Sequence, residues 1–162
     1  MSSSFAHSAE LTLRLLFSVL AGAVIGLNRW LYHKPAGLGT HSLVALGAAL
    51  ACIIVTNTKG ADAGAASRTV QGLVTGVGFI GGGVIMRANR GQQVHGLTTA
   101  ASIWASAILG IACALCDFII PAIGLSFALI ILFVSKPLEE AMERIVKRRE
   151  NGRAKEQRDH SA

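Results

Sequence analysis

A glycine-rich stretch, GVGFIGGG at residues 76–83, has the spacing of a phosphate-binding loop. Gly76, Gly78 and Gly81 match the G-x-G-x-x-G pattern of dinucleotide-binding proteins, in which the backbone closes around a pyrophosphate. That chemistry needs an acidic residue about 20 positions further on to bind the ribose, but the first acidic residue after Gly81 is Asp117. The stretch also lies inside an apolar segment, so the pattern does not predict a nucleotide site.

Cysteine and histidine are the other residue types that could do chemistry in this chain. Cys113 and Cys116 form C-x-x-C within the apolar run ILGIACALC, where we interpret them as small packing residues because no thioredoxin-like βαβ unit surrounds them. Three histidines, His33, His41 and His95, are predicted near the inner end of the bundle. They could form a metal site or a pH sensor, or they could be exposed loop histidines without a special role. The sequence contains no H-E-x-x-H, G-x-S-x-G or Walker loop, and we expect neither an enzyme nor a cofactor.

Charged residues within apolar stretches are rare here, and such residues are usually functional. Arg14 follows Glu10 by four positions, which is the favourable order for an ion pair on a helix. A structural pair and a functional role for Arg14 both stay open. Glu10, Asp62 and Asp117 are the acidic residues outside the C-terminal tail, and all three are predicted at the outer face. A magnesium pathway would therefore have few carboxylate ligands.

Composition and hydropathy predict the elements that position these residues. The chain is 52% hydrophobic and 15% charged, with a mean hydropathy of +0.53, whereas a soluble domain carries about 25% charged residues. Each apolar stretch has about 16–19 residues, close to the ~17–25 that cross a bilayer as a helix. The sequence therefore predicts an all-α membrane bundle of about five transmembrane helices. The stretches are Leu11–Leu27, His41–Thr56, Val70–Met86, Thr98–Cys116 and Phe118–Val134.

The distribution of basic residues predicts the orientation. All but three of the 15 lysine and arginine residues lie in the first connector, the third connector and the tail. The positive-inside rule then places the N-terminus outside and the C-terminus in the cytoplasm. We expect a transmembrane domain over residues 1–134. Residues 135–162 would form a charged cytoplasmic tail that begins as a short amphipathic helix and continues as a disordered segment.

Glycines four residues apart predict close helix contacts, because they let two backbones approach. The pairs are Gly22 with Gly26, Gly72 with Gly76, and Gly78 with Gly82. We expect the third stretch to be the centre of the bundle, and a leucine at Gly78 or Gly82 to disrupt it. Whether the contacts are within the chain or with a second copy stays open. Six polar residues are expected to hydrogen-bond between helices: Gln71, Thr75, Thr98, Thr99, Ser102 and Ser106.

Four sequence motifs resemble the MgtC/SapB family of bacterial inner-membrane proteins. They are LAGAVIGLNR, KPAGLGTHSLVALGAAL, GVGFIGGGVIM and VHGLTTAASIWASAILGIA, and they occur in the family's order between about Arg14 and Ala114. The resemblance implies a multi-pass protein of the bacterial inner membrane, associated with growth at low magnesium and, in pathogens, with survival in macrophages. It also implies a regulator of membrane energetics rather than a magnesium carrier. Longer members carry a C-terminal soluble domain, and we expect this chain to be the short form.

The resemblance also implies a set of motif residues, most of whose polar members are predicted at the inner ends of the first four helices. Many members carry an acidic residue where this chain has Asn28, and often an arginine where it has His95. The loss of the acid argues against cation binding. Besides Arg14, the candidate functional residues are Asn28, Arg29, Lys34, Pro35, Gly37, Thr40, His41, Gly78, Phe79, Gly81, Gly83, His95, Gly96, Leu97, Thr98, Thr99 and Ala100.

Two functions remain from the sequence. The first is support of adaptation to low magnesium by regulation of another membrane protein or of membrane energetics. The second is a small oligomeric magnesium or cation transporter or channel. The expected partners are the lipid bilayer and another membrane protein, with homo-oligomerisation left open, and we expect no nucleic acid and no resident metal.

Overall fold

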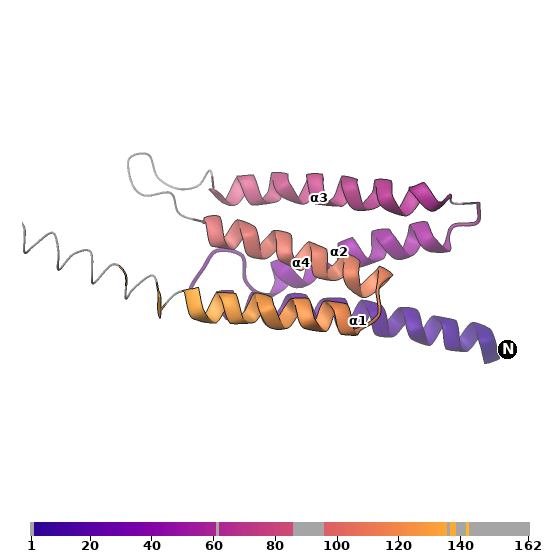
Figure 1. The fold of residues 1–162 in the computed structure, drawn as a ribbon, viewed down its shortest axis with the longest axis horizontal. Coiled ribbons are helices and arrows are strands. Elements are labelled where there is room, and N and C mark those ends of the chain that lie inside the picture. The colour runs from indigo at the N-terminus through magenta and orange to yellow at the C-terminus, as the bar shows by residue number, and fades with distance from the viewer. Residues whose placement is uncertain (1, 61, 86–95, 136, 139–141, 143–162) are drawn as a thin grey trace, which may run out of the picture. The chain divides into compact units, whose positions relative to one another are not determined.

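The computed structural model consists of helices and short connectors in the part of the chain that it describes, residues 2–60, 62–85, 96–135, 137–138 and 142. The predicted all-α class is confirmed, and the helices follow the predicted order (Figure 1). The helices are α1 (Ser2–Leu31), α2 (Leu38–Asn57), α3 (Ala63–Ile85), α4 (Leu97–Leu115) and the unlabelled helix Ile119–Ser135.

Within the described residues, three helical segments are long and apolar enough to cross a membrane: Phe5–Leu31, α2 and α4. At about 1.5 Å of rise per residue, a 20-residue helix such as α2 is as long as the ~30 Å hydrocarbon core is thick. α3 is a continuous helix, but its sequence contains several glycines and polar residues. The helix Ile119–Ser135 is apolar but shorter than these three segments. The architecture is that of a helical membrane bundle. That α3 and the helix Ile119–Ser135 also cross the membrane stays a prediction, and so does the placement of the N-terminus outside the cell.

Apolar runs locate the helices better than they locate the helix ends. α2 and α4 begin within three residues of their predicted starts, but α1 begins at Ser2 rather than Leu11, and α3 at Ala63 rather than Val70. Hydropathy marks only the part of a helix that can lie in lipid. The polar first turns of α1 and α3 therefore escaped the prediction, although serine and alanine are compatible with a helix.

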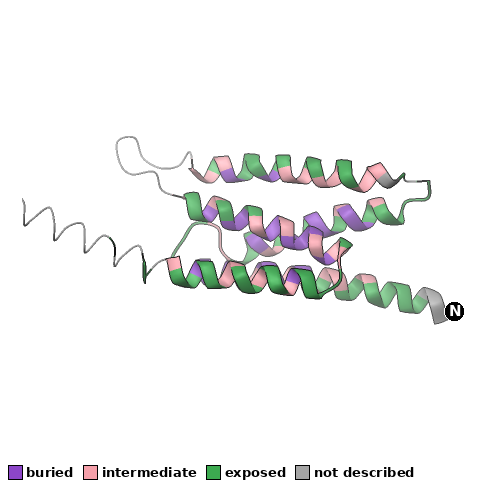
Figure 2. Ribbon diagram, in the orientation of Figure 1, coloured by how far each residue is buried: buried purple, intermediate pink, exposed green. Residues whose placement is uncertain are grey.

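α2 and α4 form the centre of the bundle, because each packs against the other three labelled helices, and this corrects the expectation that the third apolar stretch would do so. α4 packs against α1, α2 and α3, whereas α3 packs only against α4 and α2 in the described chain. Figure 2 shows buried residues along α4, while α3 is mostly exposed or intermediate. Of the α3 side chains that are described, only Val77 and Gly81 are buried. The two central helices are thus the ones whose small residues face several neighbours.

Glycines bring helix backbones together at three places. A Cβ atom added at Gly22 would lie 2.5 Å from the carbonyl oxygen of His41, and one at Gly26 would lie 2.5 Å from the Cα of Leu38. A Cβ at Gly110 would overlap the carbonyl of Ala45. α1 and α4 therefore both approach the backbone of α2 through glycine, as small-residue spacing allows in lipid.

The glycines of α3 make no such contact within the described chain. A Cβ at Gly72, Gly76, Gly78, Gly82 or Gly83 would meet no atom within 4 Å, and the neighbouring Phe79 is 87% exposed. Of the two kinds of contact that the sequence left open, the one within the chain is absent at these positions from the part of the chain that the structure describes. A leucine at Gly78 or Gly82 would not clash with the described chain, because no atom lies close to either position. Glycine spacing thus allows a close helix contact but does not show that a helix packs there. We call Gly72, Gly76, Gly82 and Gly83 the α3 glycine face.

The C-terminal part of the chain is described by itself. Contacts divide the chain into the compact units Met1–Ala128 and Leu129–Ala162, with the division inside the helix Ile119–Ser135. Most residues beyond Ser135 lie outside the described residues. The predicted boundary at residue 134 and the predicted tail helix therefore stay predictions.

The close approach at Gly110 generates a prediction about stability. Gly110→Ala should destabilise the bundle by about 1–3 kcal/mol, because the methyl group can fit only if the α2 and α4 backbones separate. The matched control is Gly72→Ala, which fills open space and replaces glycine by a better helix former. The melting temperatures of the purified variants in mild detergent should fall for Gly110→Ala and stay level or rise for Gly72→Ala. Equal melting temperatures would contradict this packing.

Candidate functional site

Polar side chains are buried together where the end of α1 meets the beginnings of α2 and α4. Buried polar residues are unusual in a bundle this apolar, and five of them lie at this end. We call these five the Arg29 cluster: Asn28, Arg29, His41, Thr99 and Ser102, each no more than 5% exposed.

Helical periodicity explains how α1 contributes to the cluster. The buried positions Ala21, Gly22, Ile25, Gly26, Asn28 and Arg29 recur every three or four residues along one face of α1. This stripe carries the two glycines that contact the first turn of α2. Asn28 and Arg29 end the same stripe, so the sequence buries a charge and an amide where a soluble amphipathic helix would expose them.

The connector between α1 and α2 places the beginning of α2 against the end of α1. His33 and Ala36 adopt positive φ angles of 51° and 63°, which permit a sharp reversal of the chain over few residues. The last carbonyl groups of α1 are used within this turn. The carbonyls of Asn28, Arg29 and Trp30 accept hydrogen bonds from the backbone N–H groups of Tyr32, Lys34 and His33 respectively.

Arg29 joins α1 to α4 through a buried hydrogen bond. Its Nη2 donates to Thr99 Oγ1 at 2.8 Å. Thr99 is the third residue of α4, and its carbonyl lies 2.8 Å from the hydroxyl of Ser102. The guanidinium is therefore directed at the N-terminal turn of α4.

His41 continues the network from α2 and corrects one of the interpretations above. The residue is fully buried, not exposed in a loop, whereas His33 is exposed. Its Nδ1 lies 2.8 Å from the carbonyl oxygen of Gly37 and its Nε2 lies 3.0 Å from Ser102 Oγ. A carbonyl can only accept, so Nδ1 donates to Gly37. The single hydroxyl proton of Ser102 can go to Nε2 of the neutral ring or to the Thr99 carbonyl, but not to both. The histidine thereby connects the first turns of α2 and α4.

Several polar atoms of the cluster have no partner. Both side-chain atoms of Asn28, Oδ1 and Nδ2, are buried without a hydrogen bond among the described residues, and so is Arg29 Nε. The ion pairs of the described chain are Arg14 with Glu10 and Arg68 with Asp62, and neither involves Arg29. The cluster therefore has spare hydrogen-bond donors and a positive charge that no described carboxylate balances. Such a set suits an anion better than a cation.

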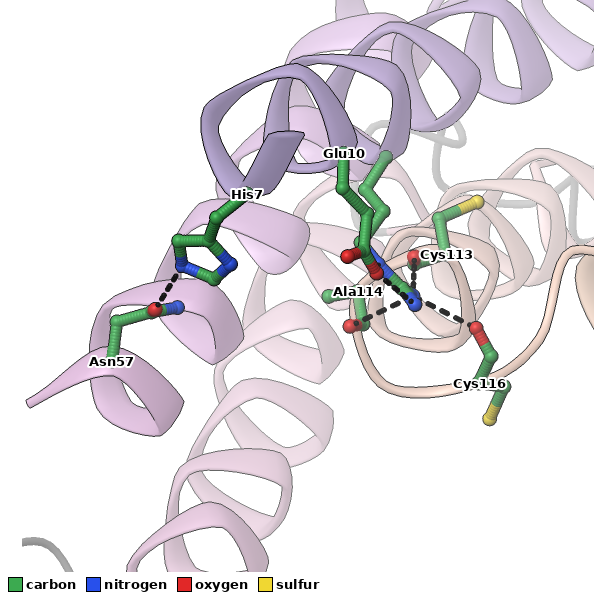
Figure 3. A network of polar contacts seen from close by, with 7 residues as sticks. His7, Glu10, Asn57, Cys113, Ala114 and Cys116 are labelled. Atoms are coloured by element: carbon green, nitrogen blue, oxygen red, sulfur yellow. Dashed lines mark hydrogen bonds and ion pairs between the residues drawn. The ribbon is translucent and has the colours of Figure 1, made fainter. Parts of the chain in front are cut away.

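The opposite end of the bundle contains a part-buried arginine, Arg14, whose acceptor residues are labelled in Figure 3. Arg14 Nη1 donates to the carbonyls of Cys113, Ala114 and Cys116 at 3.0, 3.2 and 2.8 Å. Its Nε and Nη2 bind Glu10 Oε1 at 3.0 and 2.9 Å. The guanidinium of Arg14 thus lies at the C-terminal end of α4, where the helix dipole favours a positive charge. These contacts give Arg14 a structural role as a cap for α4.

Further contacts surround this end. The guanidinium of Arg14 stacks 5.5 Å from the ring centre of Phe118, which meets Phe17 edge-on. His7 Nε2 lies 3.0 Å from Asn57 Oδ1 across α1 and α2, as Figure 3 shows. Within the described residues, no group of three His, Cys, Asp or Glu side chains could hold a metal ion.

The structure separates the remaining motif residues into two groups. Near the Arg29 cluster, Gly37 and Gly96 are the N-caps of α2 and α4, and Gly96 has a positive φ of 95° that favours glycine. Lys34, Pro35, Thr40 and Thr98 are exposed at this end. Gly78, Phe79 and Gly83 are exposed on α3, while Gly81 lies against Ala100. His95 lies outside the described residues.

Some of the polar residues expected to bridge helices do so, and others bond within their own helix. Thr99 and Ser102 do so, through Arg29 and His41. Thr75 and Ser106 instead bond to carbonyls of their own helices. Ser102 was expected to bridge helices but was not among the candidate functional residues, although its position three residues after Thr99 places it on the same face of α4.

Comparison with known proteins gives the same relationship as the motifs. The MgtC family profile matches residues 15–141. Protein SrpB of Synechococcus elongatus is 45% identical over 142 residues, covering 80% of this chain and 76% of the relative. Protein MgtC of Salmonella typhimurium is 41% identical over 133 residues, and protein MgtC of Brucella abortus is 33% identical over 138 residues.

The extent of these matches differs between relatives. The Salmonella and Brucella alignments cover 82% and 85% of this chain but 54% and 55% of those proteins. The chain therefore spans about half the length of these relatives. No solved structure matches it.

The contacts of Arg14 generate a prediction about the stability of α4. Arg14→Gln should lower the melting temperature in detergent, because three carbonyls at the end of α4 lose a charged donor, at about 1–3 kcal/mol in total. The matched control is Glu10→Gln. It removes the ion pair with the half-exposed carboxylate but keeps the carbonyl contacts, and it should cost less. A larger loss for Glu10→Gln would show that the ion pair, rather than the cap, holds this end.

Proposed function

The chain belongs to the MgtC family, and on this premise we propose that it supports adaptation of a bacterium to low magnesium by acting on another protein of the inner membrane. In a pathogen, the same activity would serve survival inside host cells. The observation that carries this proposal is the α3 glycine face. It is a helix surface of small residues beside the exposed ring of Phe79, and a Cβ added at any of its four glycines would meet no described atom of the chain within 4 Å.

The physical reason is that glycine in a lipid-facing helix contributes little packing of its own but allows close approach of another helix. In this bundle, Gly22, Gly26 and Gly110 are used in that way by the chain itself. The α3 glycine face has the same spacing and remains available. We propose that a helix of the regulated membrane protein packs there, beside the exposed ring of Phe79.

A transport function is less well supported by the charges of the bundle. The charged side chain buried between α1, α2 and α4 is Arg29, whose positive charge would repel Mg²⁺. The described acidic residues Glu10, Asp62 and Asp117 are exposed. A pathway for a divalent cation would need carboxylate or carbonyl oxygens in place of this arginine.

Growth and flux measurements separate regulation from transport. The purified full-length chain, reconstituted alone in liposomes with an internal magnesium dye, should give no more flux than empty vesicles, with or without a membrane potential. The same chain should restore growth at limiting magnesium to a bacterium lacking its own MgtC-family protein. Magnesium flux above that of empty vesicles would overturn the regulator and favour an oligomeric transporter.

A variant pair tests the α3 glycine face within this proposal. Gly76→Leu should abolish growth support while leaving the melting temperature unchanged, because the added side chain meets no described atom of the chain. The matched control is Val24→Leu, which adds bulk at an exposed position of α1 and should retain growth support. Full growth support by Gly76→Leu would show that the partner does not pack on this face.

A further inference from the structure

Two arginines of α1 meet opposite ends of α4, and only one of them is electrostatically matched. A helix carries about half a positive charge at its N-terminus and half a negative charge at its C-terminus. Arg14 lies at the C-terminal end, where a cation is favoured, and also has a carboxylate partner. Arg29 reaches the N-terminal end through Thr99, where a cation is disfavoured. The guanidinium of Arg29 therefore needs a negative partner more than Arg14 does.

The helices around Arg29 do not supply that partner. α2 and α4 both begin on glycine N-caps that make no side-chain hydrogen bond, and neither has an acidic residue in its first turn. Their first N–H groups thus lack the side-chain acceptor that usually satisfies a helix beginning. Residues 86–95, which connect α3 to α4, contain no aspartate or glutamate in the sequence.

The end of α1 does not supply the partner either. Its negative end could offset the charge of Arg29, but its last carbonyls already accept backbone hydrogen bonds in the turn to α2. The donor from Arg29 instead goes to a neutral hydroxyl, that of Thr99. A buried charge without compensation costs several kcal/mol or more, so a bound anion would stabilise the folded chain.

Asn28 provides an independent sign of a missing ligand. The residue is 2% exposed, yet neither its amide nitrogen nor its amide oxygen has a hydrogen-bond partner among the described residues. Leaving such a group unsatisfied costs about 1–3 kcal/mol. Asn28 ends the same buried stripe of α1 as Arg29. Asn28 and Arg29 are consecutive residues, so Asn28 Nδ2 and Arg29 Nε are two buried, unused donors at the same end of α1.

We propose that the Arg29 cluster binds a phosphate-type oxyanion, held by Arg29, Asn28 and the uncapped first turns of α2 and α4. A tetrahedral oxyanion has several acceptor oxygens, and guanidinium groups and helix N-termini are its usual ligands in proteins. The phosphate could be free inorganic phosphate or the phosphate of a lipid headgroup, since the chemistry is shared. Anion binding at this cluster does not depend on whether the chain regulates another protein or transports a cation.

Titration with inorganic phosphate tests the free-anion source. The full-length protein is purified in an uncharged detergent, and its melting temperature and phosphate binding by equilibrium dialysis are measured against sodium chloride of equal ionic strength. Phosphate should raise the melting temperature, and Arg29→Gln should weaken binding about tenfold or more. Arg68→Gln removes an exposed arginine outside the cluster and should bind as the unmodified chain does.

Asn28→Asp keeps the test decisive if Arg29→Gln fails to fold. The substitution preserves the shape of the side chain and places a fixed negative charge inside the cluster. It should therefore abolish phosphate binding while raising the melting temperature measured without phosphate. Unchanged phosphate affinity in Asn28→Asp would overturn the proposed site.

Nanodiscs test the lipid source. Protein extracted from phosphatidylglycerol nanodiscs should retain a phospholipid, detected by native mass spectrometry, in the unmodified chain and in Arg68→Gln but not in Asn28→Asp. A phosphate-free glycolipid should not be retained. Retention without a response to inorganic phosphate would assign the anion to a headgroup, and a phosphate response alone would assign it to the free ion. Neither response, or retention in Asn28→Asp equal to the unmodified chain, would overturn the proposal.

Discussion

The burial of Arg29 is the constraint on which the functional end of this bundle depends. A guanidinium between apolar helices must be satisfied where it lies, because there is little water to solvate it. Thr99 supplies one hydrogen bond, and the link through Ser102 and His41 ties α4 to α2. The same few contacts therefore hold the beginnings of two helices to the end of a third. Close packing of α1 on α2 at Gly22 and Gly26 makes this arrangement possible by leaving no room for other side chains.

The two ends of the bundle differ in what they can do. The charge of Arg14 is matched by the Glu10 carboxylate and by three carbonyls at the end of α4. This end therefore needs no further ligand, and its contacts hold α1 to α4. Around Arg29, donors outnumber acceptors and the charge lies at the wrong end of the α4 dipole. A chain that only needed a stable bundle would gain from an apolar residue at this position. The retained charge is therefore better explained by a ligand than by stability.

The sequence predicted where the helices lie along the chain better than it predicted which residues are buried or in contact. Apolar runs located the helices, because burial in lipid requires nearly continuous hydrophobicity. The polar start of α1, from Ser2 to Glu10, was missed since hydropathy does not detect a helix that extends beyond its apolar part. Glycine spacing correctly indicated a contact at Gly22 but made α3 the centre, because spacing describes one surface and not its partner. His41 was grouped with exposed residues because its burial depends on α1 and α4, which local sequence cannot reveal.

An experimental electron density map of the full-length protein, at a resolution that shows side chains, tests the account most directly. We expect a compact tetrahedral density within hydrogen-bonding distance of the Arg29 guanidinium and Asn28, either isolated or continuous with an acyl chain. A carboxylate of the chain's own C-terminal segment in that position, or a guanidinium surrounded by water alone, would contradict it.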